Sequence, residues 1–388
     1  MTTTIIITLC ILILLAYVFD LTSSKTKIPS VIFLLILGWL FKQLTIYFSL
    51  RIPNLSHGLP VLGTIGLILI VLEGSLELEF DKTKSPLIFK SFITALLPML
   101  GLAFGFAGLF QFFGEPDFKQ NLINLIPLCV ISSAIAIPSI RNISQYHREF
   151  VVYESSLSDI LGVLLFNFVA LNDHFGFLTF GHFILQLLII VVLSFSATIG
   201  LSFLLRKIEH HIKFIPIILL IILIYTISKV YHLPALVFIL ILGLFLGNLD
   251  KLKKFKWIAR LKPEELNREV HKFKDLTIEA AFLIRALFFL LFGYLINLGE
   301  LLNADTFIWA ISITSGIFIL RAIQLAIFKL PFLPLLFIAP RGLITILLFL
   351  SIEPTQTITL VNNSLVIQVI VLTALVMMAG LMTTKSGN

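Results

Sequence analysis

Apolar segments of about 20 residues alternate with short polar connections along almost the whole chain. About 20 apolar residues in a helix cross the ~30 Å hydrocarbon core of a bilayer. The pattern therefore predicts an all-α, multi-pass membrane protein with about thirteen transmembrane helices. The predicted spans are Ile5–Asp20, Pro29–Phe48, Gly58–Leu78, Leu87–Phe113, Asn121–Ile140, Phe150–Leu171, Gly176–Leu205, Phe214–Lys229, His232–Asn248, Leu276–Leu298, Thr306–Lys329, Pro331–Ser351 and Leu365–Met382.

Composition supports a membrane protein and excludes several other classes. Of the 388 residues, 59% are hydrophobic and 13% are charged, which is too little polar material to cover a water-soluble domain. The net charge of +7 does not indicate nucleic-acid binding in such a chain. Cys10 and Cys129 lie in apolar runs and suggest no disulfide. We expect the first apolar run to be a retained span rather than a signal peptide, and we expect no cofactor.

Lys and Arg residues in the connections predict the orientation in the membrane. Connections after odd-numbered spans and the C-terminus carry 21 of them, and connections after even-numbered spans carry 4. Basic residues accumulate on the cytoplasmic side. We therefore expect an external N-terminus, a cytoplasmic C-terminus and a location in the cell membrane. The most basic connection, residues 250–275, is expected to be a cytoplasmic loop with a short helix against anionic lipid.

Two predicted spans contain proline and small residues within the membrane. Span five includes Ser132, Ser133 and Pro138, and span twelve includes Pro340-Arg341-Gly342. Proline removes a helical hydrogen bond, so we expect helix breaks at Pro138 and Pro340. The two spans lie seven apart, so a repeat of that length would be inverted in the bilayer. Paired interruptions of this kind are typical of a transporter's ion site.

Span six carries two acids at membrane depth, where an ionised group is costly and usually functional. Asp159 lies four residues after Ser155, so the two share a helix face and offer hard oxygens to an alkali cation or a proton. Glu154 points about 100° away from Ser155. We expect it to form a structural ion pair with Arg321 on span eleven, since neither charge would be stable alone in lipid.

Three further charged residues lie within predicted spans. Glu73 on span three could reach the cation site or lie at the interface. Arg285 on span ten needs a partner that spacing does not identify. Arg341 could extend to the interface or neutralise the carbonyl ends of a half-helix.

The sequence lacks a His-Glu-x-x-His metal motif, which makes a membrane-embedded enzyme the least favoured class.

These residues resemble those of the monovalent cation/proton antiporter family, in its NhaP and eukaryotic sodium/proton exchanger branch. The branch carries Glu-Ser-x-x-Asn-Asp on span six, which matches Glu154 to Asp159, with Phe166 in register. It also has an arginine on span eleven, which matches Arg321, and a Gly/Pro-Arg-Gly on span twelve. The chain departs from the branch where Ser158 replaces asparagine and Ser132-Ser133-Ala134 replaces Thr-Asp-Pro. The latter run is closer to the Kef-type potassium/proton branch.

The resemblance implies an antiporter fold in which an ion-carrying core moves against a dimerising scaffold. It places the scaffold at about 1–80 and 176–298 and the core at about 87–171 and 306–384, within one integral membrane domain. It implies a homodimer in membrane lipid with a role in pH homeostasis. The chain would exchange Na⁺, or K⁺ or Li⁺, for H⁺, because Asp159 binds either a proton or a cation. The expected oxygen ligands are those of Asp159, Ser155, Ser158 and Glu73, together with backbone carbonyls that are freed where span five unwinds near Ser132 and Ser133.

The same resemblance implies electroneutral exchange, because the chain lacks the paired Asp-Asp of electrogenic relatives. Two alternatives stay open. The protein could be a Kef-like potassium/proton transporter or channel, as the run after Ile131 suggests. It could also be a transport-inactive relative that acts as a sensor or scaffold, because an acid of span five is missing.

Overall fold

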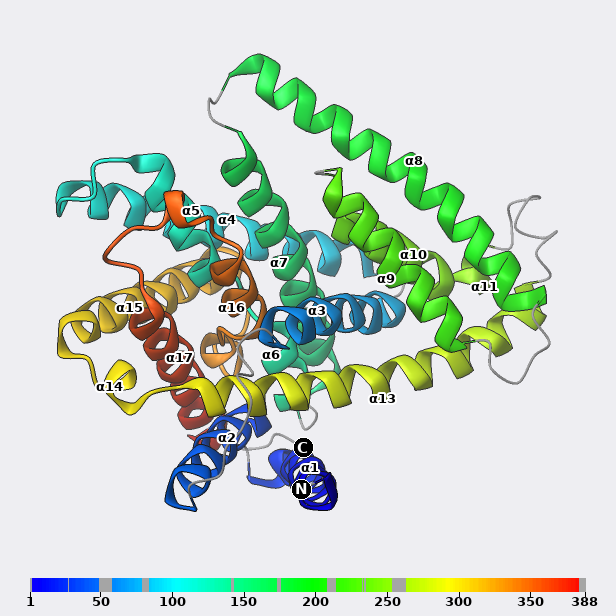
Figure 1. The fold of residues 1–388 in the computed structure, drawn as a ribbon. Coiled ribbons are helices and arrows are strands. Elements are labelled where there is room, and N and C mark those ends of the chain that lie inside the picture. The colour runs from blue at the N-terminus through cyan, green and yellow to red at the C-terminus, as the bar shows by residue number, and fades with distance from the viewer. Residues whose placement is uncertain are drawn as a thin grey trace. The chain divides into compact units, whose positions relative to one another are not determined.

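The computed structural model describes residues 2–26, 28–48, 58–78, 84–140, 143–172, 176–207, 214–231, 233, 235–252 and 263–383. The described residues form helices and contain no strand, which confirms the all-α class (Figure 1). The α-helices are α1 (Thr2–Thr26), α2 (Ser30–Tyr47), α3 (Gly58–Glu77), α4 (Ser85–Phe112), α5 (Phe118–Cys129), α6 (Ser133–Ser139), α7 (Gln145–Leu171), α8 (Phe177–Lys207), α9 (Phe214–Val230), α10 (Ala235–Gly247), α11 (Leu249–Leu252), α13 (Pro263–Leu295), α14 (Leu298–Leu301), α15 (Ala304–Ile327), α16 (Leu343–Leu350) and α17 (Asn363–Thr383), and two 3₁₀ turns are η2 (Leu335–Phe337) and η3 (Pro354–Gln356).

The helices follow the predicted spans closely. Nine stretches of the described chain are long and apolar enough to cross a membrane, and α5 and α6 together count as one of them. Three shorter apolar helices, within α1 and at α9 and α10, coincide with three more predicted spans. The predicted span Pro331–Ser351 is the interrupted segment that contains η2 and α16.

One predicted connection is largely helical. We expected span ten to begin at Leu276, but α13 begins at Pro263. Leu266, Val270 and Phe273 recur at helical spacing and are buried, so this charged segment is an amphipathic helix with one apolar face. A short helix was expected in this connection, but its continuity with span ten was not, because mean hydropathy does not register such a face. Residues 253–262 of the predicted basic loop lie outside the described part of the chain.

The chain divides into two compact units. The first contains residues 1–64, 88–162 and 283–388, and the second contains 65–87 and 163–282. In the first unit, α5 packs against α16, α6 packs against α1 and α2, and α15 packs against α17 and η2. In the second unit, α8, α9 and α10 pack against one another. The predicted division into scaffold and ion-carrying core stays a prediction.

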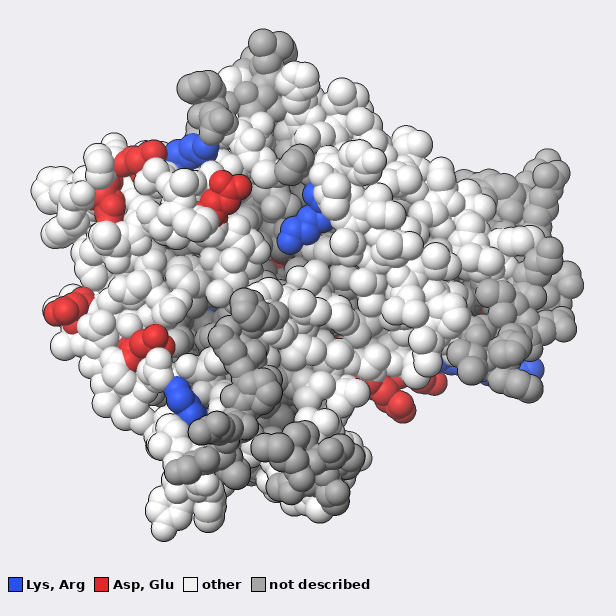
Figure 2. Space-filling model, viewed as in Figure 1, with Lys and Arg blue, Asp and Glu red and all other residues white. Residues whose placement is uncertain are grey.

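The surface of the described helices is rich in apolar side chains. The face in Figure 2 carries few charged groups between its margins. Many large apolar side chains are exposed, for example Leu14, Phe89, Val192 and Ile308. Exposing these apolar side chains to water would cost free energy, whereas contact with lipid hydrocarbon does not. The surface therefore fits a protein that is surrounded by lipid.

Glycines allow a very close helix contact in the first unit, between α2 and α13. A Cβ atom on Gly38 would lie 2.2 Å from the Leu290 carbonyl oxygen, and one on Gly293 would lie 2.4 Å from the Leu35 carbonyl oxygen. Both obstacles are backbone atoms, which cannot turn aside. Small residues allow membrane helices to approach in this way, which gains van der Waals contact where no hydrophobic driving force exists between helices.

Replacing Gly293 with leucine should therefore separate α2 from α13. Overpacking of this kind costs on the order of 1–3 kcal/mol or more, so we expect a clearly lower unfolding temperature of the purified protein in detergent. Gly108→Leu on α4 is the matched control, because its Cβ would meet nothing within 4 Å. Equal unfolding temperatures for the two variants would contradict the proposed contact.

Candidate functional site

The first interruption lies between α5 and α6. Helix α5 ends at Cys129, residues 130–132 are not helical, and α6 begins at Ser133. The break that we expected at Pro138 is therefore misplaced, since Pro138 lies inside α6 near its end. The position was mispredicted because the break is stabilised by hydrogen bonds to groups outside span five, which the local sequence does not reveal. Ile131 N donates to the Ser158 hydroxyl oxygen at 2.9 Å, and Ser132 N donates to the Pro340 carbonyl oxygen at 2.9 Å.

The second interruption lies between η2 and α16, and Pro340 lies within it. It crosses the first interruption at very close range. A Cβ atom on Gly342 would lie 2.6 Å from Ile135 Cδ1 and 2.8 Å from Ser132 Oγ. Glycine at this position therefore allows the backbone of one break to lie against the first turn of α6.

Arg341 bonds the carbonyl groups that the breaks expose. It is 2% exposed, and its Nε donates to the Leu128 carbonyl oxygen at 2.8 Å while Nη1 donates to the Ala339 carbonyl oxygen at 2.9 Å. Leu128 lies in the last turn of α5, where the helix dipole places partial negative charge. Thr373 Oγ1 on α17 accepts from Arg341 N at 3.1 Å. Of the two alternatives for Arg341, the contact with half-helix carbonyls is the one that the structure contains.

Asp159 lies on α7 opposite the first interruption and is 1% exposed. The Ser133 hydroxyl donates to Asp159 Oδ2. Asp159 Oδ1 has no hydrogen-bonding partner among the described residues, and the same holds for Ser132 Oγ. The structure thus brings together Asp159, Ser158, Ser132 and Ser133 of the predicted ligand set, with two buried oxygen atoms still able to accept a bond.

Ser155 and Gly162 shape the helix on either side of Asp159. Ser155 is fully buried, and its hydroxyl donates to the Val151 carbonyl oxygen at 2.7 Å, which leaves the oxygen's acceptor capacity for another partner. A Cβ atom on Gly162 would lie 2.3 Å from Val130 Cγ2. Glycine here lets the non-helical segment lie directly on α7, close to the carboxylate.

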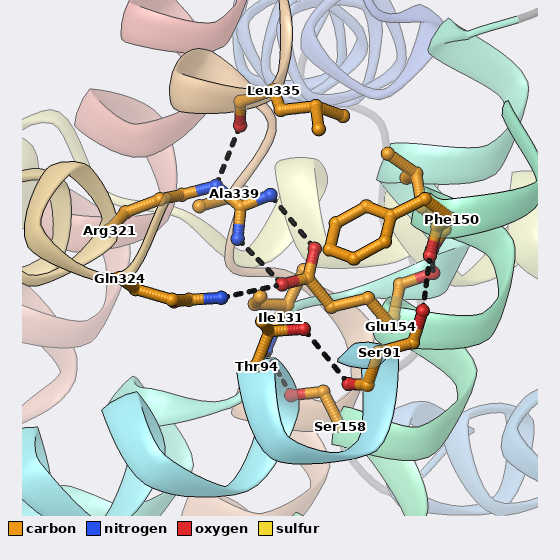
Figure 3. Close-up of polar contacts among 12 residues, drawn as sticks. Ser91, Thr94, Ile131, Phe150, Glu154, Ser158, Arg321, Gln324, Leu335 and Ala339 are labelled. Carbon is orange, nitrogen blue, oxygen red and sulfur yellow. Dashed lines mark hydrogen bonds and ion pairs between the residues drawn. The ribbon is translucent and has the colours of Figure 1, made fainter. Parts of the chain in front are cut away.

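Glu154 and Arg321 form the buried ion pair that we expected from spacing. Arg321 Nη1 and Nη2 lie 2.9 and 2.8 Å from the two carboxylate oxygens, as Figure 3 shows. Gln324 Nε2 donates to Glu154 Oε1 at 3.1 Å, and Arg321 Nε donates to the Leu335 carbonyl oxygen at 2.7 Å. The pair therefore connects α7, α15 and η2. Our sequence reasoning missed Gln324, although a polar residue one turn after Arg321 on an apolar helix was a usable signal.

The roles of two further predicted residues stay predictions. Glu73 is half-buried on α3 and belongs to the second unit, so its role as a ligand stays a prediction. Arg285 is half-buried on α13, and no ion pair or hydrogen bond joins its side chain to another described residue. The described residues also contain no group of three or more His, Cys, Asp or Glu side chains that could hold a metal ion.

Comparisons with known proteins identify the family. The model of the family described as "Sodium/hydrogen exchanger, transmembrane" matches residues 10–384. The chain belongs to this family. It is therefore a multi-pass membrane protein of a transporter family, and membership supports cation/proton antiport as its activity. Among curated proteins, none matches the sequence.

Solved structures show the same fold. The sodium proton antiporter MjNhaP1 from Methanocaldococcus jannaschii at pH 8 superposes with a TM-score of 0.70 at 18% identity, covering 97% of this chain and 99% of that one. A second structure of MjNhaP1, from electron microscopy, gives a TM-score of 0.67 at 19% identity over 97% and 94% of the two chains. The antiporter fold expected from the sequence is confirmed.

The ion pair yields a test of its own. Arg321→Met leaves the buried Glu154 carboxylate without its counter-charge, which should cost about 3–5 kcal/mol and greatly lower the unfolding temperature in detergent. Neutralising both members in Glu154→Gln/Arg321→Met should recover most of that loss. A double variant as unstable as Arg321→Met alone would show that the lost stability does not come from the uncompensated carboxylate.

Proposed function

We propose that this protein exchanges a monovalent cation for a proton across the cell membrane, with both ions competing for Asp159. Na⁺ is the preferred candidate, with K⁺ and Li⁺ as possible substrates. The observation that supports this most directly is the geometry of the carboxylate. One of its oxygens accepts a bond from Ser133, and the other is buried without a partner among the described residues.

The two acids of α7 support the choice of Asp159 over Glu154. Both Glu154 oxygens accept bonds from Arg321, and one also accepts from Gln324. A cation would have to displace a guanidinium from that carboxylate. Asp159 accepts a hydrogen bond from Ser133 and is joined to no cationic side chain among the described residues, so a cation can approach it without breaking an ion pair.

Competition between the two ions follows from electrostatics. A buried carboxylate without a counter-charge is costly, and binding either a proton or an alkali cation removes that cost. Occupation by one ion abolishes the negative charge that attracts the other. A site of this kind, opened to each side of the membrane in turn, exchanges the two ions without covalent chemistry.

The charge of the cluster favours electroneutral exchange. Ser132 and Ser133 are neutral, the pair of Glu154 and Arg321 has no net charge, and Arg341 keeps its charge throughout. Asp159 alone changes occupancy in this proposal, so one cation is exchanged for one proton. We extend the proposal to a homodimer with an external N-terminus and a cytoplasmic C-terminus, as the resemblance and the basic residues imply.

Asp159→Asn should abolish cation-dependent proton flux in proteoliposomes that carry a pH gradient, with a loss of at least about a hundredfold. The amide is neutral, so it neither releases a proton nor attracts a cation. Asp305→Asn is the matched control, since Asp305 is exposed in the first turn of α15. Undiminished exchange in Asp159→Asn would overturn the proposal, and a wild-type chain without exchange would favour the transport-inactive relative.

Electroneutrality has a separate test in the same vesicles. Imposing a membrane potential of either sign should leave the initial rate of Na⁺/H⁺ exchange unchanged, because no net charge crosses the membrane. Parallel assays with Na⁺, K⁺ and Li⁺ identify the preferred cation. A strong dependence of the rate on the potential would contradict one-for-one exchange, and potassium flux that persists without a proton gradient would indicate a Kef-like channel.

A further inference from the structure

Ser156 is a buried hydroxyl beside Asp159 to which the proposed mechanism gives no role. Its side chain is 8% exposed, and its Oγ has no hydrogen-bonding partner among the described residues. Burying an unsatisfied hydroxyl costs roughly 1–3 kcal/mol. A serine in a membrane helix normally avoids this cost by bonding the carbonyl group four residues earlier.

Several other serines of this chain follow that rule. The hydroxyls of Ser155, Ser202 and Ser351 all donate to the carbonyl oxygen four residues before them, at 2.7 Å in each case. Ser156 has no such bond to Val152, although it lies in the same helix as Ser155. The contrast shows that the backbone of α7 permits such a bond at Ser155, whereas the Ser156 hydroxyl does not form it.

Helix geometry places Ser156 next to the carboxylate. Residues three and four apart are neighbours on a helix surface, so Ser155 and Ser156 both lie one turn before Asp159. Viewed down the helix axis, the two serines lie on either side of the Asp159 side chain. Asp159 Oδ1 and Ser132 Oγ are the other buried, unpartnered oxygens of this region. Ser132 precedes Ser133, which bonds Asp159 Oδ2, and Ser156 lies one turn before Asp159 on α7.

We propose that Ser156 is a specificity-determining residue of the cation site and lends its hydroxyl oxygen to the bound cation. The proposal rests on the function proposed for Asp159. An alkali cation that leaves water must regain oxygen contacts from the protein, and neutral hydroxyl and carbonyl oxygens supply them without adding charge. Ser132 from the first interruption and Ser156 from α7 would then complete the shell on two sides of the single carboxylate.

An unpartnered hydroxyl alone does not make a site, and the chain itself provides the comparison. Ser228 on α9 is 1% exposed, and its Oγ also has no partner among the described residues. It lies on a helix that carries neither interruption nor carboxylate. Ser228→Ala removes the same atom from a similar environment, which makes it the matched control.

The experiment measures half-saturating cation concentrations for proteoliposome exchange and for thermal stabilisation of the purified full chain by Na⁺, Li⁺ and K⁺. Losing one oxygen contact should raise the half-saturating Na⁺ concentration of Ser156→Ala by roughly three- to tenfold. Ser156→Thr, which keeps the hydroxyl, and Ser228→Ala should behave as the wild type. Ser156→Cys preserves the size of the side chain but offers a soft sulfur, so it should also weaken Na⁺ binding. This variant serves as the test if Ser156→Ala does not fold.

The outcomes separate the two proposals. If Asp159→Asn loses exchange while Ser156→Ala and Ser156→Cys keep the wild-type half-saturating concentration, the role of Ser156 is refuted and the proposed function stands. If Asp159→Asn exchanges as the wild type does, or if none of the three cations stabilises the wild-type chain, both proposals are refuted. A raised half-saturating concentration in Ser228→Ala as well would show that the effect is general and would also refute the role of Ser156.

Discussion

The need to bond every backbone group away from water governs the first unit of this protein. Helix interruptions in a membrane expose amide and carbonyl groups that hydrocarbon cannot solvate. Each interruption bonds the other, through the Ser132 amide and the Pro340 carbonyl group. Side chains bond several of the other groups, including Ser158 on α7 and Arg341 between η2 and α16. Several polar residues of the site are thus committed to the backbone, and Asp159 is distinguished by its remaining acceptor.

Two carboxylates on one helix have opposite surroundings as a result. Glu154 is enclosed by Arg321 and Gln324, and this arrangement also bonds a carbonyl group of η2. Asp159, little more than one turn later, faces uncharged serines. Because a buried ion pair strongly resists separation, the first acid acts as a structural connection between helices. The second acid keeps a charge that a mobile ion can neutralise.

Sequence reasoning captured the features that depend on local pattern. Segment hydropathy located the spans, and the requirement for charge compensation in lipid correctly joined Glu154 to Arg321. The position of the first break was not predictable in this way, because Ile131 and Ser132 are held by residues far along the chain. The early start of α13 was overlooked because its apolar face is hidden among charges, and a periodicity analysis of Leu266, Val270 and Phe273 would have revealed it.

The bond between the two interruptions joins main-chain atoms alone, so it requires no particular functional group at position 132, provided that the residue is not proline and is small enough to lie against Gly342. The side chain there can therefore vary in chemistry while the crossing itself stays in place. Evolution could in this way retune ion preference within a lineage without redesigning its architecture. Because the backbone fixes the crossing, a substitution at position 132 can change cation selectivity while the fold stays the same.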